Sequence, residues 1–390
     1  MQFRTRAIHV GQEPDPATGA VVPPIHLAST FVQPGAGEEG PFEYSRGKNP
    51  TRYALERTVA DLEGCGPDAP NGGGAMAFAS GMAATACVIA SLRSGDHVLA
   101  GADLYGGTYR LLHKIANRAG VTVTMADSTR PDVFAESLRP ETKLVWVESP
   151  GNPKLSITDL AAIAELAHAR GAVMACDNTF ATPVLTRPLE LGADIVMHSA
   201  TKYYGGHSDV MGGLLAVRGQ ALYDDLKFVQ NATGGIMAPL EAFLVSRGVK
   251  TLELRVREQS RTAQSLAEWL LEQPQVERVN YPGLPGHPGH DVARRQMDGA
   301  FGAMISFELK AGFHAAKRMV ESTRLFHLAV SLGAVESLIE QPASMSHASY
   351  SPEDKAKHGI TDGMIRLSVG LEAADDLRDD LQQALAASVG

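Results

Sequence analysis

Short apolar runs that alternate with helix-like stretches constrain the fold of this 390-residue chain more than any other feature. The runs lie at Val121–Met125, Leu144–Val147, Ala172–Cys176, Ile195–Met197 and Leu214–Val217. Apolar runs of this length are typical of buried parallel strands, because helices cover both faces of such a sheet. Between them, Thr108–Ala119 and Thr158–Arg170 place their apolar side chains on one helical face. We therefore predict an α/β fold with a mostly parallel sheet between helices.

Two further segments flank this region. Residues 1–52 hold many Gly and Pro and show no periodicity, yet they contain apolar Val21, Ile25 and Phe31, so we expect this arm to pack on another surface. A long helical pattern at Thr251–Leu271 precedes a strand-like run at Met304–Leu309. The sequence thus predicts an N-terminal arm (1–52), a large domain (53–248) and a smaller C-terminal α/β domain (249–390).

Composition excludes several classes of function. The net charge is −9, and no cluster of basic residues indicates a nucleic-acid partner. Neither a signal peptide nor an apolar run long enough for a membrane span is present, so we expect a cytoplasmic protein with no membrane partner. Cys65, Cys87 and Cys176 lie far apart, without the spacing of a zinc site, and we expect no metal.

Two residues that follow predicted strands carry the chemistry. Asp177 comes directly after an apolar run, where a carboxylate is costly unless a cation or hydrogen-bond donor meets it. It is suited to hold a protonated heterocyclic nitrogen, although a lone Asp here is also typical of a helix N-cap or an internal ion pair. Lys202 follows the next run, and a partly desolvated lysine can form a Schiff base and carry protons.

Hydroxyl and backbone groups near these residues indicate a phosphate site. Ser199 and Thr201 place two hydroxyls beside Lys202, and Gly81 and Met82 begin an apolar helix whose free N–H groups can bind an anion. The run Gly72–Gly74 lacks the Lys-Ser/Thr of a Walker loop. No G-x-G-x-x-G joins a strand to a helix, which disfavours a nicotinamide dehydrogenase.

With these motifs in place, the chain resembles the Cys/Met-metabolism family of pyridoxal-phosphate (PLP) enzymes over essentially its whole length. That family includes cystathionine γ-synthase, cystathionine γ-lyase, cystathionine β-lyase and methionine γ-lyase. The resemblance runs through Tyr44-Ser45-Arg46, Asn49-Pro50-Thr51-Arg52, Ser80-Gly81-Met82, Tyr105-Gly106-Gly107-Thr108, Asn152-Pro153, Asp177-Asn178-Thr179-Phe180, Ser199–Lys202, Tyr281-Pro282-Gly283, Ser331-Leu332-Gly333 and Arg366–Gly370.

The resemblance implies the PLP aminotransferase-like fold (fold type I) and a role for each matching residue. Lys202 would hold PLP, Asp177 would pair with the pyridine nitrogen, and Tyr105 would stack on the ring and serve as an acid or base. The phosphate would be bound by Gly81, Met82, Ser199 and Thr201, and by Tyr44 and Arg46 of a neighbouring subunit in a homo-oligomer, a tetramer built from dimers. The substrate α-carboxylate would be held by Arg366 with Ser331 and Asn152.

The implied reaction is a γ-elimination from a small sulfur amino acid that gives a thiol, a 2-oxo acid and ammonia. Within the family, the residue before Ser331 helps to separate substrates, and Val330 favours a short apolar thioether such as methionine. Gly107, where methionine γ-lyases usually have Cys, favours the cystathionine enzymes instead. Methionine and cystathionine therefore both stay open as substrates.

Three other functions are alternatives to a γ-lyase. A γ-synthase that joins an acylated homoserine to cysteine comes next after the γ-lyases, and a cystathionine β-lyase is a further alternative. A PLP-fold protein turned binding or regulatory module is disfavoured, because Lys202, Tyr105 and Arg366 are all present and no DNA-binding segment flanks the domain.

Overall fold

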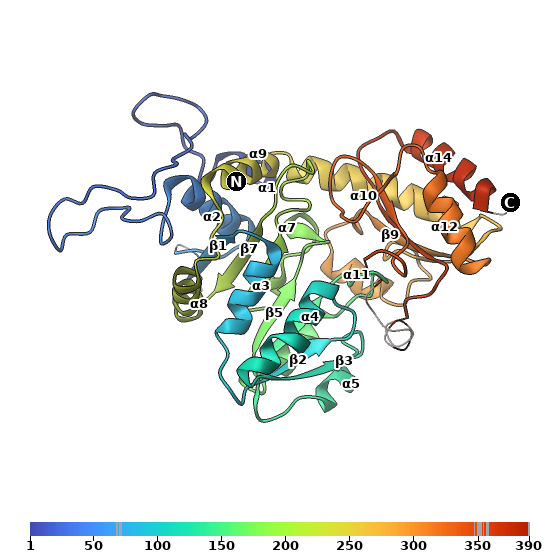
Figure 1. Ribbon diagram of the computed structural model, residues 1–390, viewed down its shortest axis with the longest axis horizontal. Coiled ribbons are helices and arrows are strands. Elements are labelled where there is room, and N and C mark those ends of the chain that lie inside the picture. The colour runs from blue at the N-terminus through green and yellow to red at the C-terminus, as the bar shows by residue number, and fades with distance from the viewer. Residues whose placement is uncertain are drawn as a thin grey trace.

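The computed structural model describes residues 1–67, 69, 72–346, 348, 353, 355 and 359–388. Its centre is a seven-stranded sheet with the order β1-β7-β6-β5-β4-β2-β3, which occupies the middle of the molecule in Figure 1. The strands are β1 (Gly73–Phe78), β2 (His97–Gly101), β3 (Thr122–Ala126), β4 (Thr142–Glu148), β5 (Val173–Asp177), β6 (Ile195–Ser199) and β7 (Gly213–Arg218). The predicted α/β fold with a mostly parallel sheet is confirmed.

β7 runs antiparallel to both of its neighbours, β1 and β6, which differs from the prediction that Leu214–Val217 is a parallel strand. A parallel crossover needs a long connection that is usually helical. Here the chain turns back after Ser199 through residues 200–212 without a helix and enters β7 at Gly213. The loop that carries Lys202 is therefore fixed at both ends by adjacent strands.

Helices cover both faces of the sheet, as predicted. One face packs on α3 (Gly81–Ala90), α4 (Gly106–Lys114) and α8 (Gln220–Thr233) through side chains such as Val88, Leu112 and Leu226. The other face packs on α5 (Pro131–Glu136) and α6 (Leu160–His168), with Phe134 and Ile163 fully buried. The helix predicted at Thr108–Ala119 begins earlier, directly after Tyr105, and ends in a separate 3-10 turn, η1 (Ala116–Ala119).

β1 was not predicted because its residues are mostly small and include part of the glycine run. Those glycines allow close packing: a Cβ on Gly73, which has φ +93°, would lie 2.0 Å from the carbonyl oxygen of Val217 on β7. A Cβ on Gly74 would lie 2.8 Å from the ring of Tyr223 on α8. The glycines thus serve strand and helix packing rather than a phosphate loop.

A second sheet of five strands, in the order β10-β11-β12-β9-β8, forms the C-terminal part of the fold. Its strands are β8 (Val276–Asn280), β9 (Met304–Leu309), β10 (His327–Leu328), β11 (Leu338–Glu340) and β12 (Met364–Ser368). It packs with α10 (Leu252–Leu271), α12 (Gly312–Ser322) and α14 (Ala374–Ser388). The predicted boundary at residue 248 falls at the end of α9 (Pro239–Val249) and stays a prediction.

The N-terminal arm projects away from the rest of the chain between α1 (Phe3–His9) and α2 (Pro50–Glu63), as the two long blue loops in Figure 1 show. Its apolar side chains lie in solvent: Val21 is 79% exposed, Leu27 76% and Val32 98%. Burying apolar side chains is favourable, and within the described part of this chain the arm has no surface that buries these three.

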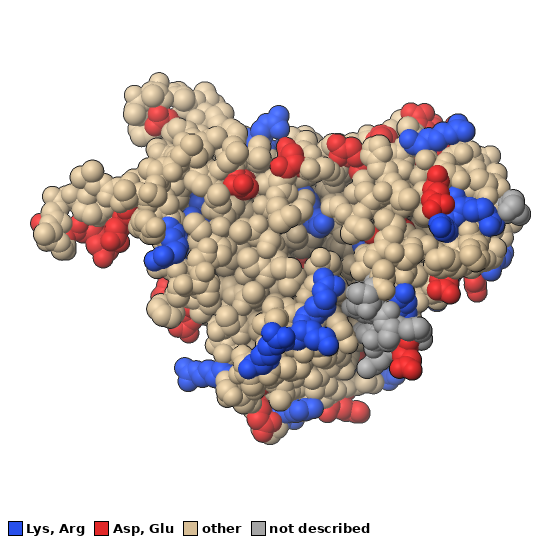
Figure 2. Space-filling view, viewed as in Figure 1, with Lys and Arg blue, Asp and Glu red and all other residues tan. Residues whose placement is uncertain are grey.

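No helix among the described residues is long and apolar enough to cross a membrane. On the face that Figure 2 shows, acidic and basic side chains are scattered over the surface, with one group of Lys and Arg near the lower centre.

Candidate active site

A cavity of about 260 Å³ lies at the carboxyl ends of β4, β5 and β6, where open α/β sheets bind their ligands. The second part of the chain closes it with residues 330–332, 346 and 366. The predicted site residues that line it are Gly81, Met82, Tyr105, Asn152, Asp177, Ser199, Thr201, Lys202, Val330, Ser331 and Arg366.

Asp177 is the last residue of β5, and its side chain is buried at the cavity wall. One of its carboxylate oxygens accepts a hydrogen bond of 3.0 Å from the N–H of Thr179. Burial raises the pKa of this carboxyl above its ordinary value, and the Thr179 bonds oppose that rise. A cation entering the cavity would therefore gain a partner that the protein has left largely uncompensated.

Lys202 lies on the β6–β7 loop and reaches toward the second part of the chain. Its Nζ donates a hydrogen bond of 2.8 Å to the hydroxyl of Ser331. Burial, followed by the nearby charge of Arg366, lowers the pKa of Lys202 from 10.5 to about 8. A sizeable fraction of this amine is thus neutral near physiological pH, as a nucleophile toward an aldehyde must be.

The cavity also offers groups for an anion. Ser80 caps α3, because its side chain accepts a hydrogen bond from the N–H of Ala83. The N–H groups of Gly81 and Met82 lie in the first turn, where no carbonyl of the helix can accept a hydrogen bond from them. A Cβ on Gly81 would lie 3.1 Å from that of Ser199, so glycine lets the helix start approach β6 closely. The Thr201 hydroxyl lies on the same wall and bonds to the backbone of Gly212.

Tyr105 also lines the cavity, and 46% of its surface is exposed. Its backbone N–H meets both oxygens of Glu148, at 2.8 and 2.9 Å, so the glutamate fixes the residue that begins α4. Glu148 ends β4 in register with Asp177 on β5. Burial, together with the charge of Asp177, raises the pKa of Glu148 well above its ordinary value.

Arg366 on β12 supplies the cationic end of the cavity. Its Nη1 donates to the side-chain oxygen of Asn152 at 2.9 Å, and its Nη2 donates to the carbonyl of Ser331 at 3.0 Å. Nη1 also lies 3.0 Å from an oxygen of Glu340, and both side chains of this ion pair are buried. The predicted trio of Arg366, Ser331 and Asn152 is brought together here.

Tyr44 and Arg46 do not line the cavity of their own chain. The Arg46 guanidinium lies 5.4 Å from the centre of the Tyr44 ring and bonds to Asn231 near the end of α8. Tyr44 is 49% exposed. Both residues therefore sit on the arm, outside the cavity that the rest of the predicted set forms.

Sequence reasoning missed several residues that line the cavity or contact its lining, among them Glu148, Thr179 and Glu340. Glu148 could have been found by the rule that singled out Asp177, because it too is a carboxylate directly after an apolar strand. Thr179 lies in the motif Asp177-Asn178-Thr179-Phe180, but the motif alone does not indicate what it does. Its hydroxyl accepts a hydrogen bond of 2.8 Å from the N–H of Ser199 and so links the ends of β5 and β6. Glu340 follows only two apolar residues, and its short strand gave no signal.

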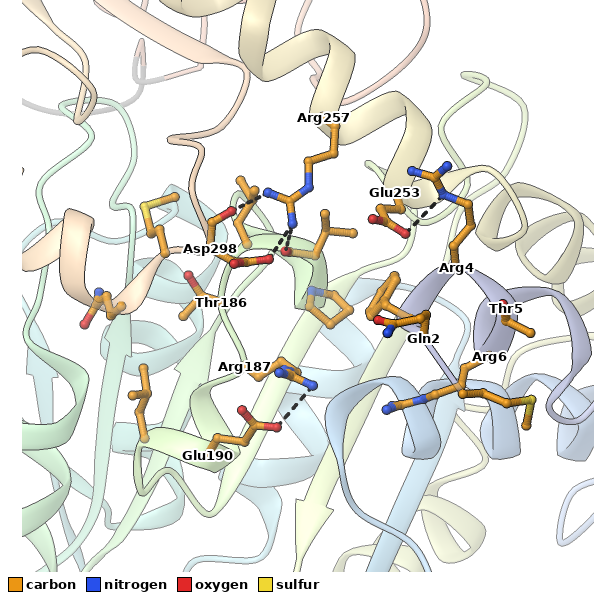
Figure 3. Close-up of a pocket in the computed structure, with 18 of the residues that line it drawn as sticks. Gln2, Arg4, Thr5, Arg6, Thr186, Arg187, Glu190, Glu253, Arg257 and Asp298 are labelled. Carbon is orange, nitrogen blue, oxygen red and sulfur yellow. Dashed lines mark hydrogen bonds and ion pairs between the residues drawn. The ribbon is translucent and has the colours of Figure 1, made fainter.

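A larger cavity of about 840 Å³ lies elsewhere, between α1, α7 (Thr182–Leu185), α10 and α11 (His290–Gln296). It is rich in arginine, but Figure 3 shows these side chains already engaged: Arg4 with Glu253, Arg187 with Glu190 and Arg257 with Asp298. A carboxylate ligand would have to displace those partners, whereas the smaller cavity offers an amine, a buried carboxylate and the start of a helix together.

The residues of the smaller cavity fit pyridoxal phosphate. A buried carboxylate, Asp177, is matched to a protonated ring nitrogen, and an amine with a lowered pKa, Lys202, is matched to an aldehyde. The start of α3 with Ser199 and Thr201 is matched to a phosphate.

Comparisons with known proteins agree with this geometry. Residues 4–386 match the family described as Cys/Met metabolism PLP-dependent enzyme. The chain is 52% identical to a cystathionine β-lyase of Coxiella burnetii (98% of this chain, 97% of that one) and 50% identical to a cystathionine γ-synthase of Mycobacterium tuberculosis (98% and 96%). A crystal structure of cystathionine γ-lyase from Lactobacillus plantarum, complexed with L-serine, superposes with a TM-score of 0.95 at 44% identity and covers 100% of both chains.

Proposed function

Since the chain belongs to the Cys/Met-metabolism family of PLP-dependent enzymes, we propose that it breaks the bond between sulfur and the γ carbon of a sulfur amino acid, with cystathionine as its first substrate. The observation that carries this proposal is the contact between Lys202 and Ser331 in a cavity that also holds Asp177 and Arg366. An amine that can move protons therefore lies beside the groups suited to an amino acid's carboxylate.

Bound PLP supplies an electron sink that acidifies the α carbon of an amino acid, and the protein decides which bond breaks by orienting that carbon. In this proposal, Lys202 and Asp177 hold the aldehyde and ring-nitrogen ends of the cofactor. The start of α3 and the hydroxyls of Ser199 and Thr201, which line the same cavity, would hold its phosphate.

Arg366 binds the substrate α-carboxylate, helped by Asn152 and Ser331, and this fixes the α carbon near Lys202. The neutral Nζ of Lys202 accepts the α proton, passes it to water and then accepts a β proton, which allows the γ sulfur to leave as a thiolate. Tyr105, which lines the cavity and is half-exposed, donates a proton to the departing sulfur.

The names of the relatives favour cystathionine over methionine, because each of the three compared proteins carries cystathionine in its name. γ-Elimination from cystathionine consumes water and yields cysteine, 2-oxobutanoate and ammonia. A γ-synthase is the second candidate, supported by the 50% identity with the mycobacterial enzyme. A β-lyase is the third, supported by the Coxiella protein.

Product identification separates these activities. The purified protein loaded with PLP is incubated with cystathionine, and the products are resolved by mass spectrometry. Cysteine with 2-oxobutanoate supports the γ-lyase, whereas homocysteine with pyruvate shows β-elimination and contradicts our proposal. Net formation of cystathionine from an O-acylhomoserine and cysteine, faster than its cleavage, would establish the synthase. Methionine tested in parallel gives methanethiol if it is also a substrate.

Our proposal includes a homo-oligomer in which the arm of one subunit reaches the cavity of another. The exposed apolar side chains of the arm support it, and so does the position of Tyr44 and Arg46 outside their own cavity. In this arrangement Tyr44 and Arg46 meet the phosphate of the neighbouring site, and dimers pair into a tetramer. Residues 53–248 form the PLP-binding domain, and residues 249–390 form the substrate-binding domain.

A further inference from the structure

Glu340 and Arg366 face each other across two antiparallel strands at the edge of the cavity. They are register partners on β11 and β12, and their charged atoms lie 3.0 Å apart. Their exposed fractions are 1% and 4%. Both charges have therefore left water almost completely, and the pair is costly to bury.

The hydrogen bonds of Glu340 do not fully offset the free energy lost when the pair leaves water. One carboxylate oxygen serves both Arg366 Nη1 and the hydroxyl of Ser346, which is 2.8 Å away. The other oxygen is buried and has no hydrogen-bond partner among the described residues. A buried carboxylate that is only half satisfied costs folding free energy, so its presence points to a task besides stability.

The donors of Arg366 show what that task is. Glu340 and Asn152 together occupy Nη1, and the carbonyl of Ser331 takes one N–H of Nη2. The buried Nε has no acceptor in the described part of the chain, and one N–H of Nη2 is also left. Nε and Nη2 share one edge of the planar guanidinium, the edge that suits a carboxylate bound through two parallel hydrogen bonds.

We propose that Glu340 is a positioning residue for the substrate carboxylate: it holds the Nη1 end of Arg366 so that the Nε/Nη2 edge stays directed to the ligand. This inference rests on the proposed role of Arg366 as the α-carboxylate site. Glu340 itself touches no substrate. Without it, Asn152 and Ser331 remain as partners, but the guanidinium loses the charged contact that fixes its rotation.

A second cross-strand pair in the same sheet provides a control. Arg278 on β8 and Glu308 on β9 are also register partners and form an ion pair. Arg278 is 55% exposed, and neither residue lines the cavity. Removing Glu308 tests the loss of a sheet ion pair without any effect on Arg366.

The test uses the PLP-loaded protein and two ligands that cannot react, because they lack an amino group: γ-methylthiobutyrate and its carboxamide, γ-methylthiobutyramide. Isothermal titration calorimetry measures both dissociation constants for wild type, Glu340→Ala, Glu340→Gln and Glu308→Ala. We expect Glu340→Ala to bind the carboxylate roughly tenfold more weakly, the size of one charge-assisted hydrogen bond, and to bind the amide as wild type does. Glu340→Gln keeps an acceptor oxygen and should stay within about threefold of wild type.

Several results would overturn the inference. If Glu340→Ala binds the carboxylate as tightly as wild type, or more tightly, then Glu340 only neutralises the charge of Arg366 and does not position it. An equal loss for both ligands indicates general distortion, and a Gln variant as weak as the Ala variant shows that charge rather than orientation matters. Should Glu340→Ala fail to fold, Glu340→Asp, which withdraws the carboxylate by one methylene, must show the same selective loss.

Failure of the wild type to prefer the carboxylate over the amide has a different meaning. It would remove Arg366 as the carboxylate site, and with it the proposed function. If the wild type prefers the carboxylate and the Glu340→Ala variant keeps the same preference, only the role of Glu340 is contradicted.

Discussion

The amine of Lys202 donates a hydrogen bond to the hydroxyl of Ser331, 2.8 Å away and 129 residues later in the chain. This bond joins the two parts of the active site, because Lys202 follows β6 of the large sheet while Ser331 contacts the guanidinium of Arg366 through its carbonyl. The charge of Arg366 also depresses the pKa of Lys202, so carboxylate binding and lysine protonation are electrostatically linked.

The first prediction concerns the pH at which the apo protein captures PLP. The neutral amine reacts with the aldehyde, and the pKa of Lys202 is lowered from 10.5 to about 8. The rate of capture should therefore rise as pH increases and level off above about pH 8. Stopped-flow absorbance of the cofactor measures this rate, and a midpoint close to 10.5 would contradict the lowered pKa.

Replacing Arg366 by Gln should move that midpoint to higher pH, because the variant removes a positive charge that disfavours protonated Lys202. The matched control is Arg278→Gln, which removes a guanidinium from the same sheet but outside the cavity. A midpoint unchanged in Arg366→Gln would show that burial alone sets the pKa.

Lys202→Ala should abolish turnover and leave the fold intact, because the amine provides chemistry more than packing. The variant can still bind PLP through the other contacts, but not covalently. Borohydride reduction and peptide mapping should label Lys202 in wild type. A label on another lysine, or turnover at the wild-type rate in the variant, would refute the assignment.

Mixed oligomers test the arm. Arg46→Ala and Lys202→Ala should each be inactive alone, and their hybrids should regain partial activity, because one subunit then contributes an intact arm and the other an intact lysine. Subunit exchange is verified by native mass spectrometry. Complete exchange without any recovery would place Arg46 in the site of its own chain.

Val330 lines the cavity with 61% of its surface exposed and offers no charge to the distal groups of cystathionine. Val330→Glu should raise the ratio of cystathionine to methionine kcat/KM about tenfold, if one charged contact contributes ~1.4 kcal/mol. Val330→Gln, similar in shape but uncharged, is the control. An unchanged ratio in Val330→Glu would mean that residue 330 only packs the cavity wall.

Glu148→Ala should lower the free energy of unfolding of the apo protein by about 1–3 kcal/mol, because the N–H of Tyr105 loses both acceptor contacts. Glu148→Gln keeps an acceptor and should lose less. Chemical denaturation measures both changes. Equal losses in the two variants would show that the negative charge at the start of α4, rather than the hydrogen bond, is what stabilises.

Local patterns were enough to place Asp177 and Lys202 at the edge of the sheet where ligands bind, since both follow apolar strands directly. Their roles toward the cofactor came from the family resemblance and stay predictions. Glu340 was out of reach, because its importance comes from a partner on another strand and its own strand is three residues long. The direction of β7 was also missed. It depends on the course of residues 200–212, which carry no periodic pattern.

The position of the arm shows a different limit. Its sequence indicates that Val21 and Ile25 should pack against a surface, but one chain alone does not indicate which surface that is. Tyr44 and Arg46 consequently received their roles from the family resemblance, and those roles stay predictions.

The cavity is lined by residues from the whole length of the chain, with Gly81 early in the sequence and Arg366 late. During synthesis on a ribosome, the large sheet is complete long before β12 emerges. A nascent chain can therefore shape the cofactor end of its pocket while it still lacks the guanidinium that would select amino acids. If Arg366 holds the substrate carboxylate as proposed, an unfinished chain that already holds cofactor would still lack the group that positions an amino acid for reaction.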